Sequence, residues 1–244
     1  MFKEVDVMKE SNIKDNKVLI IILGALLIII SLLSIYIRNK SNDSLKFKEE
    51  YESLNDTVAY KNIKYPTVSL DKKNPFVYKT EDEIIEIVKN GTGLIYLGYP
   101  KCPWCRNAVN VLQRVDTDKI YYLNMYDLRD EYKVENDVLI KTKEGSNGYY
   151  TLLKLLDSIL DDYIIKDNDK EYNVNEKRVY VPLVVGIKEG KIVGYHMDTV
   201  DLKDNQSPMD LLDKKQQEKL LEIYENINIS VNSEICDIDD NGGC

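Results

Sequence analysis

Two cysteines, Cys102 and Cys105, are separated by two residues in the segment KCPWCR at 101–106. An apolar run with strand character at 94–97 precedes them, and a helical pattern at 107–115 follows them. This arrangement favours thiol–disulfide exchange, in which one thiolate reacts with a partner disulfide and the second thiol resolves the mixed disulfide. The helix dipole and unpaired N–H groups favour the anion of Cys102, and Cys105 is expected to be the buried, resolving thiol.

The residues around the two cysteines fit this chemistry. Pro103 suits the first turn of a helix, because no N–H partner is required there. Lys101 and Arg106 are expected to add positive charge that lowers the pKa of Cys102 further. Trp104 is expected to offer an apolar surface to a partner protein.

The other two cysteines, Cys236 and Cys244, bracket an acidic C-terminal segment. We expect them to form a small structural disulfide, with a second exchange pair or intermolecular bonds as alternatives. Zinc bound by all four cysteines is a further alternative, but zinc needs ligand pairs of regular spacing. The spacing of the second pair is irregular and His196 is the single histidine, so no metal is expected.

The composition argues against a nucleic-acid-binding protein. The chain of 244 residues carries 33 Lys and Arg against 42 Asp and Glu, a net charge of −9. A phosphate-binding surface requires clustered Lys and Arg. Hydrophobic residues make up 43% of the chain, which is enough for the core of one domain with additional segments.

An apolar run of 20 residues without charge, VLIIILGALLIIISLLSIYI, occupies 18–37. As a helix it would span about 30 Å, the thickness of the hydrocarbon core of a membrane. The apolar core of a signal peptide is usually only about 7–15 residues long and precedes a small-residue cleavage site, so we expect an uncleaved anchor. Charges flank the run on both sides and do not orient it. The short N-terminal tail favours a single-pass protein of the cell membrane with an extracytoplasmic C-terminal domain.

The chain is accordingly expected to contain five segments. These are a cytoplasmic tail (1–17), a transmembrane helix (18–37), a polar stalk (38–64), a folded domain (65–228, with an insertion at about 126–178) and an acidic Cys-containing tail (229–244).

Helices and strands alternate in the predicted domain. The expected elements are a helix from the capping box Thr80–Glu83 to the turn at 90–93, a strand at 94–99, a helix to 115, a strand at 120–125, a helix at 149–163, strands at 179–187 and 191–196, and a helix at 209–226 after Ser207-Pro208. The first two strands and their helix have βαβ order, so the strands should be parallel. Pro182 lies within an expected strand and marks an edge, a bulge or a cis bond.

These elements resemble the thioredoxin superfamily. The resemblance rests on the strand at 94–99, Cys-Pro-Trp-Cys, the following helix, the strand at 120–125 and Val181-Pro182. It implies an α/β fold of three layers, a central mixed sheet flanked by helices. It also implies that Pro182 is cis and touches the cysteines, and that Val181 helps to select substrates. Membrane-anchored thioredoxin-like proteins of Gram-positive bacteria, including bacteriocin transport accessory proteins, are similar in having Cys-Pro-aromatic-Cys after Gly-x-Pro, here 98–100.

One position departs from the family pattern. Many thioredoxin-like proteins carry a buried acid six residues before the first cysteine, where this chain has Tyr96. The usual proton acceptor for the resolving thiol is therefore absent or supplied from elsewhere, which leaves the direction of electron flow open.

The resemblance implies a thiol–disulfide oxidoreductase that forms, reduces or isomerises disulfides in exported Cys-containing proteins. No bound cofactor is expected, because electrons would come from a dithiol of a membrane redox partner. Two alternatives remain. One is a non-catalytic docking module of a secretion or bacteriocin export system, with the two cysteines locked as a structural disulfide. The other is metal trafficking through the cysteine pair.

Overall fold

The computed structural model describes the chain from residue 2 to 233, with the side chains of 21–35, 38 and 42–233. The chain divides into two compact units, Met1–Asp43 and Ser44–Cys244, and helix α1 (Phe2–Glu52) runs from the first into the second. The predicted disulfide between Cys236 and Cys244 lies outside the described residues.

The first unit is helical, and its side chains at 21–35 are all exposed. The predicted membrane span, 18–37, extends at both ends beyond the side chains described there. Among the described residues, no helix meets the length and apolar character needed to cross a membrane.

The second unit is built around a five-stranded mixed sheet in the order β11-β10-β4-β5-β3. Its strands are β3 (Phe76–Tyr78), β4 (Gly93–Gly98), β5 (Ile120–Asn124), β10 (Leu183–Lys188) and β11 (Lys191–Met197). The first three are parallel, and β10 is antiparallel to both β4 and β11. The strands predicted next to the cysteines are therefore confirmed to within a residue or two, whereas β3 was not predicted.

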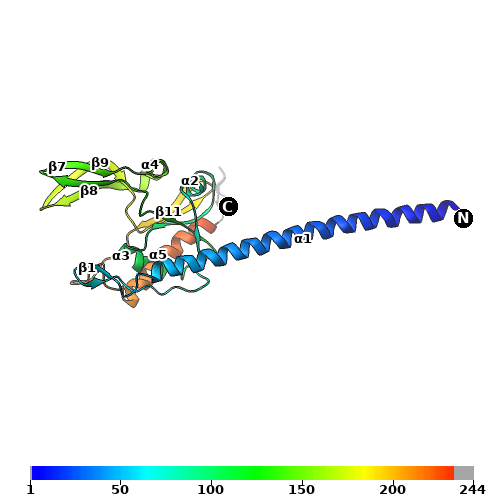
Figure 1. The fold of residues 1–244 in the computed structure, drawn as a ribbon, viewed down its shortest axis with the longest axis horizontal. Helices are drawn as coiled ribbons and strands as arrows, with labels where there is room; N and C mark the ends of the chain where they lie inside the picture. The colour runs from blue at the N-terminus through cyan, green and yellow to red at the C-terminus, as the bar shows by residue number, and fades with distance from the viewer. Residues whose placement is uncertain (1, 234–244) are drawn as a thin grey trace, which may run out of the picture. The chain divides into compact units, whose positions relative to one another are not determined.

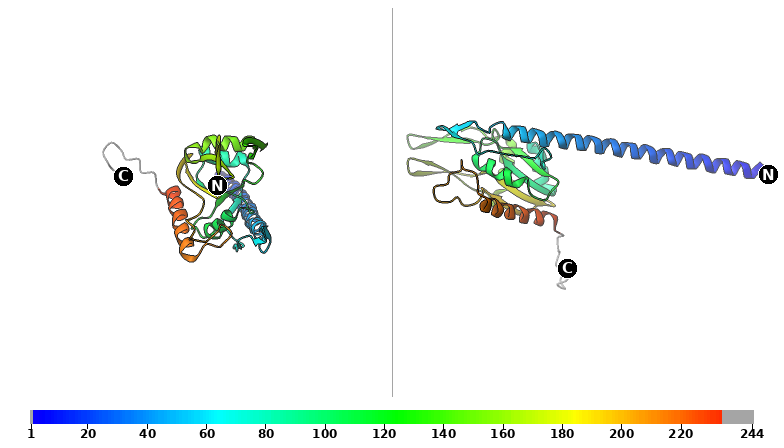
Figure 2. Two further views of the ribbon diagram at one scale, coloured as in Figure 1. Left: turned by 90° about the vertical axis from the view of Figure 1, so that its left-hand side faces the viewer. Right: turned by 90° about the horizontal axis from the view of Figure 1, so that it is seen from below.

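Two pairs of helices cover the two faces of the sheet (Figure 2). On one face lie α2 (Glu81–Asn90) and α4 (Asn147–Leu155), and on the other α3 (Pro103–Leu112) and α5 (Lys214–Asn232). The predicted capping box of α2 is confirmed, with reciprocal bonds between Thr80 and Glu83. The domain is thus a mixed α/β fold whose central sheet is flanked by helices.

Two predicted helices have different bounds in the structure. The helix expected at 149–163 ends at Leu155 and is followed by a short 3-10 turn, because Asp161 already pairs with a strand of the insertion. The last helix begins at Lys214 rather than 209. Ser207 closes a separate turn with the Asp210 carboxylate, and Asp213 caps α5 instead.

The insertion predicted at 126–178 contributes α4 to the helix layer and adds two β-hairpins. These are β6 (Glu131–Glu135) with β7 (Val138–Lys143), and β8 (Asp161–Asp167) with β9 (Lys170–Arg178). The hairpins lie side by side and extend away from the central sheet (Figure 1). Each turns at an Asn-Asp pair with positive φ at both residues, the geometry of a two-residue type I′ turn.

An ion pair joins the ends of the insertion. Asp130 precedes β6 and is 1% exposed, and its carboxylate lies 3.6 Å from the Arg178 guanidinium at the end of β9. The same guanidinium stacks over the Tyr163 ring of β8 at 3.9 Å. The two hairpins are therefore fixed to each other at their bases.

The predicted stalk is wrong from Ser44 onward. The last turns of α1 belong to the folded unit, because Phe47 and Tyr51, four residues apart on one helix face, are fully buried. The Phe47 ring stacks on Phe76 of β3 with centroids 3.9 Å apart, and Ser44 donates a hydrogen bond to the Asn74 carbonyl. Residues 44–52 therefore form part of the core rather than a spacer.

This packing predicts the effect of Phe47→Ala. Removing a fully buried aromatic ring leaves a cavity and should lower the free energy of unfolding by about 3–5 kcal/mol. Urea unfolding of the full chain in detergent, followed by fluorescence of the single tryptophan, measures it. Leu45→Ala on the exposed side of the same helix is the matched control and should change the free energy by about 0.5 kcal/mol or less. Equal effects of the two substitutions would contradict the assignment of this segment to the core.

Candidate active site

Cys102 and Cys105 lie at the first turn of α3, directly after the buried central strand β4. Cys102 is the N-cap residue, and its sulfur accepts a hydrogen bond from the Cys105 N–H at 3.2 Å. Pro103 follows in the first helical turn, where its missing N–H costs nothing. Cys102 is 5% exposed and Cys105 is fully buried, and neither forms a disulfide in the structure.

The two sulfurs have opposite acid–base properties. Burial raises the pKa of Cys102, but hydrogen bonds from the Cys105 thiol and N–H, together with the charge of Arg129, outweigh it and hold the pKa below its ordinary value. Burial and the adjacent Cys102 sulfur raise the pKa of Cys105 well above its ordinary value. Cys102 is therefore suited to be the attacking thiolate and Cys105 to remain a thiol until it is needed.

Arg129 supplies the largest charge effect on Cys102, and sequence reasoning missed it. It lies in the loop between β5 and β6, at the start of the insertion. Its guanidinium donates to the Tyr99 hydroxyl at 3.1 Å and to the Val179 carbonyl at 3.5 Å, and lies over the Tyr99 ring. No local motif signals this role, because Arg129 meets Cys102 only through the folding of the insertion.

The two cations predicted to act on Cys102 are engaged elsewhere. Arg106 is fully buried and donates hydrogen bonds to three carbonyls, those of Tyr51, Pro66 and Pro100, and to the Asn55 side chain. Lys101 is exposed and contacts Tyr126. Arg106 is therefore a structural cation, contrary to the prediction.

The Val181–Pro182 segment meets Cys102 across the fold through the Val181 carbonyl. Its peptide bond is cis, and the Cys102 sulfur lies 3.6 Å from the Val181 carbonyl oxygen, to which the thiol donates. Pro182 precedes β10 and so removes no donor from the sheet. A cleft of about 380 Å³ opens over Cys102, and its walls include Trp104, Tyr180 and Met209. Trp104 is thus a half-buried part of the wall of this cleft.

Tyr96 lies in the middle of β4 and is fully buried beneath the cysteines. Its hydroxyl is 2.9 Å from the Tyr51 hydroxyl of α1. Hydrogen bonding from the Tyr99 backbone, and to a smaller extent from the Tyr96 hydroxyl, acts to lower the pKa of Cys105 but does not outweigh the effect of burial. Burial raises the pKa of Tyr96 well above its ordinary value, so that its hydroxyl is neutral. Among the described residues, Asp130 is the one carboxylate that is fully buried, and it pairs with Arg178.

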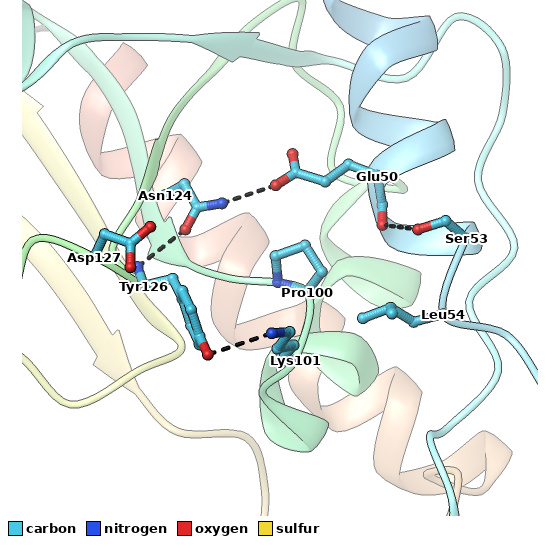
Figure 3. A pocket seen from close by; sticks show the side chains of 8 residues that line it. All are labelled: Glu50, Ser53, Leu54, Pro100, Lys101, Asn124, Tyr126 and Asp127. Carbon is cyan, nitrogen blue, oxygen red and sulfur yellow. Dashed lines mark hydrogen bonds between the residues drawn. The ribbon is translucent and has the colours of Figure 1, made fainter. Parts of the chain in front are cut away.

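A second, polar pocket of about 250 Å³ lies on the other side of Lys101 (Figure 3). Glu50 from the end of α1 and Asn124 from the end of β5 face each other there, joined by a hydrogen bond of 2.8 Å. Pro100 and Lys101 of the loop before Cys102 form part of its wall. The pocket holds no cysteine, so its contribution is to support that loop.

No metal site is evident in the chain between residues 2 and 233, which contains no group of three or more His, Cys, Asp or Glu side chains placed to bind an ion.

Comparisons of the chain with protein-family models, with curated proteins and with solved structures found no match. The chemistry of the site therefore has to be argued from its own geometry.

The role of Arg129 predicts a change in the reactivity of Cys102. Arg129→Gln removes the positive charge but keeps hydrogen-bonding capacity, so the pKa of Cys102 should rise. The pH dependence of alkylation by iodoacetamide measures this, and the midpoint should move to higher pH. Lys101→Gln removes an exposed cation next to Cys102 in sequence and is the matched control, with a smaller shift expected. A larger shift in the control would contradict the assignment.

The hydrogen bonds of Arg106 predict a loss of stability in Arg106→Met. The methionine fills part of the volume but leaves three buried carbonyls without the donor that Arg106 supplies, which should cost about 3 kcal/mol or more. Urea unfolding measures it. Arg114→Met, on an exposed site just past the end of α3, is the matched control and should cost about 0.5 kcal/mol or less. A small effect of Arg106→Met would show that water replaces these bonds.

Proposed function

We propose that this chain is a membrane-anchored, extracytoplasmic thiol–disulfide oxidoreductase with a thioredoxin-like domain. The observation that carries the proposal is the pair of sulfurs at the tip of α3, one with a lowered pKa and the other fully buried with a raised pKa. That asymmetry is what exchange through a mixed disulfide requires.

The arrangement of the domain supports the thioredoxin-like assignment. The mixed sheet lies between two helix pairs, and the cysteines begin the helix that follows the central strand β4. The Val181–Pro182 bond directly precedes β10, the antiparallel neighbour of β4, and faces Cys102. This contact between residues far apart in sequence supports the proposed thioredoxin-like assignment.

In the reductive direction, the Cys102 thiolate attacks one sulfur of a substrate disulfide. A bond forms between Cys102 and that sulfur, and the other substrate sulfur leaves as a thiolate. Cys105 then loses its proton and attacks Cys102, which forms the Cys102–Cys105 disulfide and releases the second substrate thiolate. Two electrons pass from the cysteine pair to the substrate. The reverse sequence oxidises a substrate dithiol. After either reaction, the dithiol or disulfide of a membrane redox partner returns Cys102 and Cys105 to their starting oxidation state.

The cleft over Cys102 is suited to a polypeptide substrate. It is open, it carries the Trp104 and Met209 side chains, and the half-buried Val181 lies beside the reacting sulfur. An extended segment of an exported Cys-containing protein would bring its own sulfur to Cys102 along this wall. No cofactor is required by the exchange.

The membrane anchor is part of the proposal. It is supported by the uncharged run at 18–37 and by the apolar side chains at 21–35, which are exposed on all sides of the helix in the described part of that unit. With the anchor in the membrane and the C-terminal unit exported, the substrates would be proteins of an oxidising compartment, where disulfides persist.

A docking module without catalysis is the second candidate, and the burial of both sulfurs favours it. With Cys102 only 5% exposed, a Cys102–Cys105 disulfide would be sheltered from partners. The reduction potential separates the two functions, because a value well below about −300 mV is typical of structural disulfides. A less negative potential supports exchange.

The proposed function predicts that Cys102→Ser abolishes disulfide exchange, and that Cys105→Ser accumulates mixed disulfides with substrate. Reduction of insulin and non-reducing gels measure the two outcomes. The control replaces both Cys236 and Cys244 by Ser, which removes the two cysteines outside the motif and should leave exchange in place. Full insulin-reducing activity of Cys102→Ser would contradict the proposal.

A further inference from the structure

The tyrosines that act on the Cys105 sulfur are neutral. The titratable side chains that act on it are Cys102 of α3 and five tyrosines, from α1, β4, the loop after β4, β5 and α5 (Tyr51, Tyr96, Tyr99, Tyr122 and Tyr224). Burial raises the pKa of every one of these tyrosines, so each hydroxyl keeps its proton at neutral pH. A buried thiolate formed at Cys105 would therefore depend on hydrogen-bond donors rather than on a cation.

Among these hydroxyls, that of Tyr96 is placed to act as a donor to Cys105. Hydrogen bonding from it acts to lower the pKa of Cys105, and the hydroxyl is held in place by the Tyr51 hydroxyl at 2.9 Å. The ring is fixed by stacking against Tyr122, with centroids 5.5 Å apart. The Tyr224 hydroxyl, in contrast, has no hydrogen-bond partner within the described residues.

The backbone leaves room for this placement. Tyr96 and Gly98 lie on the same face of β4, and a Cβ atom at Gly98 would stand 2.2 Å from the Tyr96 hydroxyl oxygen. Glycine at this position therefore allows the hydroxyl to lie along the strand toward the cysteines. Tyr51 completes the arrangement from the last turn of α1, where its own carbonyl accepts a bond from Arg106.

We propose that the Tyr96 hydroxyl stabilises the Cys105 thiolate during resolution of the mixed disulfide, and that Tyr51 positions Tyr96 for this task. The proposal rests on the oxidoreductase function above. In the resolving step Cys105 loses its proton to water or to the departing substrate thiolate, while Tyr96 keeps its own and donates a hydrogen bond to the developing anion. Tyr96 is thus a catalytic donor at the position where many thioredoxin-like proteins carry a buried acid, and Tyr51 is a positioning residue.

The test follows the second half of the exchange. The full chain in detergent is loaded at Cys102 with thionitrobenzoate, and attack by Cys105 releases the coloured thiolate, which is followed from neutral to alkaline pH. Loss of one hydrogen bond to an anion should lower the thiolate population of Tyr96→Phe about tenfold. Greater nucleophilicity of the more basic sulfur offsets part of this, so the rate at neutral pH should fall about threefold and the midpoint of the pH profile should rise.

Two further variants separate donation from packing. Tyr51→Phe should shift the pH profile of thionitrobenzoate release in the same direction as Tyr96→Phe, but by a smaller amount. If Tyr96→Phe does not fold, the shift in Tyr51→Phe tests the proposal instead. Tyr224→Phe is the matched control, because it removes a buried hydroxyl that acts on Cys105 without removing a hydrogen bond. Its profile should match that of the unmodified protein. Profiles of Tyr96→Phe and Tyr51→Phe that coincide with the control would overturn the proposal.

Failure of the proposed function is recognised separately. If Cys105→Ser releases thionitrobenzoate as fast as the unmodified protein, Cys105 does not resolve mixed disulfides and the oxidoreductase mechanism fails. If Cys105→Ser retains the adduct and Tyr96→Phe resolves it normally, only the role of Tyr96 is rejected.

Discussion

The buried guanidinium of Arg106 is the interaction on which the site depends. A fully buried cation is costly unless its donors are satisfied. Here it donates to the end of α1 through Tyr51 and Asn55, to the loop at Pro66 and to the loop before the cysteines at Pro100. Because the acceptors come from three separate segments, the full set of bonds requires all three segments to be in place. The position of Cys102 is therefore tied to the docking of α1.

This coupling explains why the last turns of α1 belong to the domain. Arg106 holds the Tyr51 carbonyl, and the Tyr51 side chain in turn meets Tyr96 beneath Cys105. Phe47, one turn earlier, packs on β3 and fixes the same helix face against the sheet. Residues 44–52, predicted as part of a stalk, thus supply both a part of the core, through Phe47, and a side chain that contacts Tyr96, through Tyr51.

The sequence predicted what depends on neighbours along the chain. The strand–cysteine–helix unit around Cys102, the capping box of α2 and the hairpin of β10 and β11 all follow from local patterns, and each is present. Apart from the approach of Val181-Pro182 to Cys102, which the resemblance implied, contacts between distant segments could not be predicted. Nothing local shows that Arg106 turns inward to carbonyls while Arg129 turns toward Cys102, because both side chains are long cations next to apolar residues. The burial of residues 44–52 was missed for the same reason. A few apolar residues in a charged segment do not show by themselves that the segment is buried, because their burial depends on the sheet that they contact.

The position of Arg129 shows why the insertion matters to the chemistry. Its neighbour Asp130 is buried in the opposite direction, against Arg178 at the end of the second hairpin. A buried ion pair adds little net stability but strongly penalises any arrangement that separates the charges. The pair therefore fixes the backbone at 129–130, and with it the side from which the Arg129 guanidinium approaches Tyr99 and Cys102. The hairpins act on the Cys102 sulfur through this short segment, because the Asp130–Arg178 pair at their bases positions the charge of Arg129 beside it.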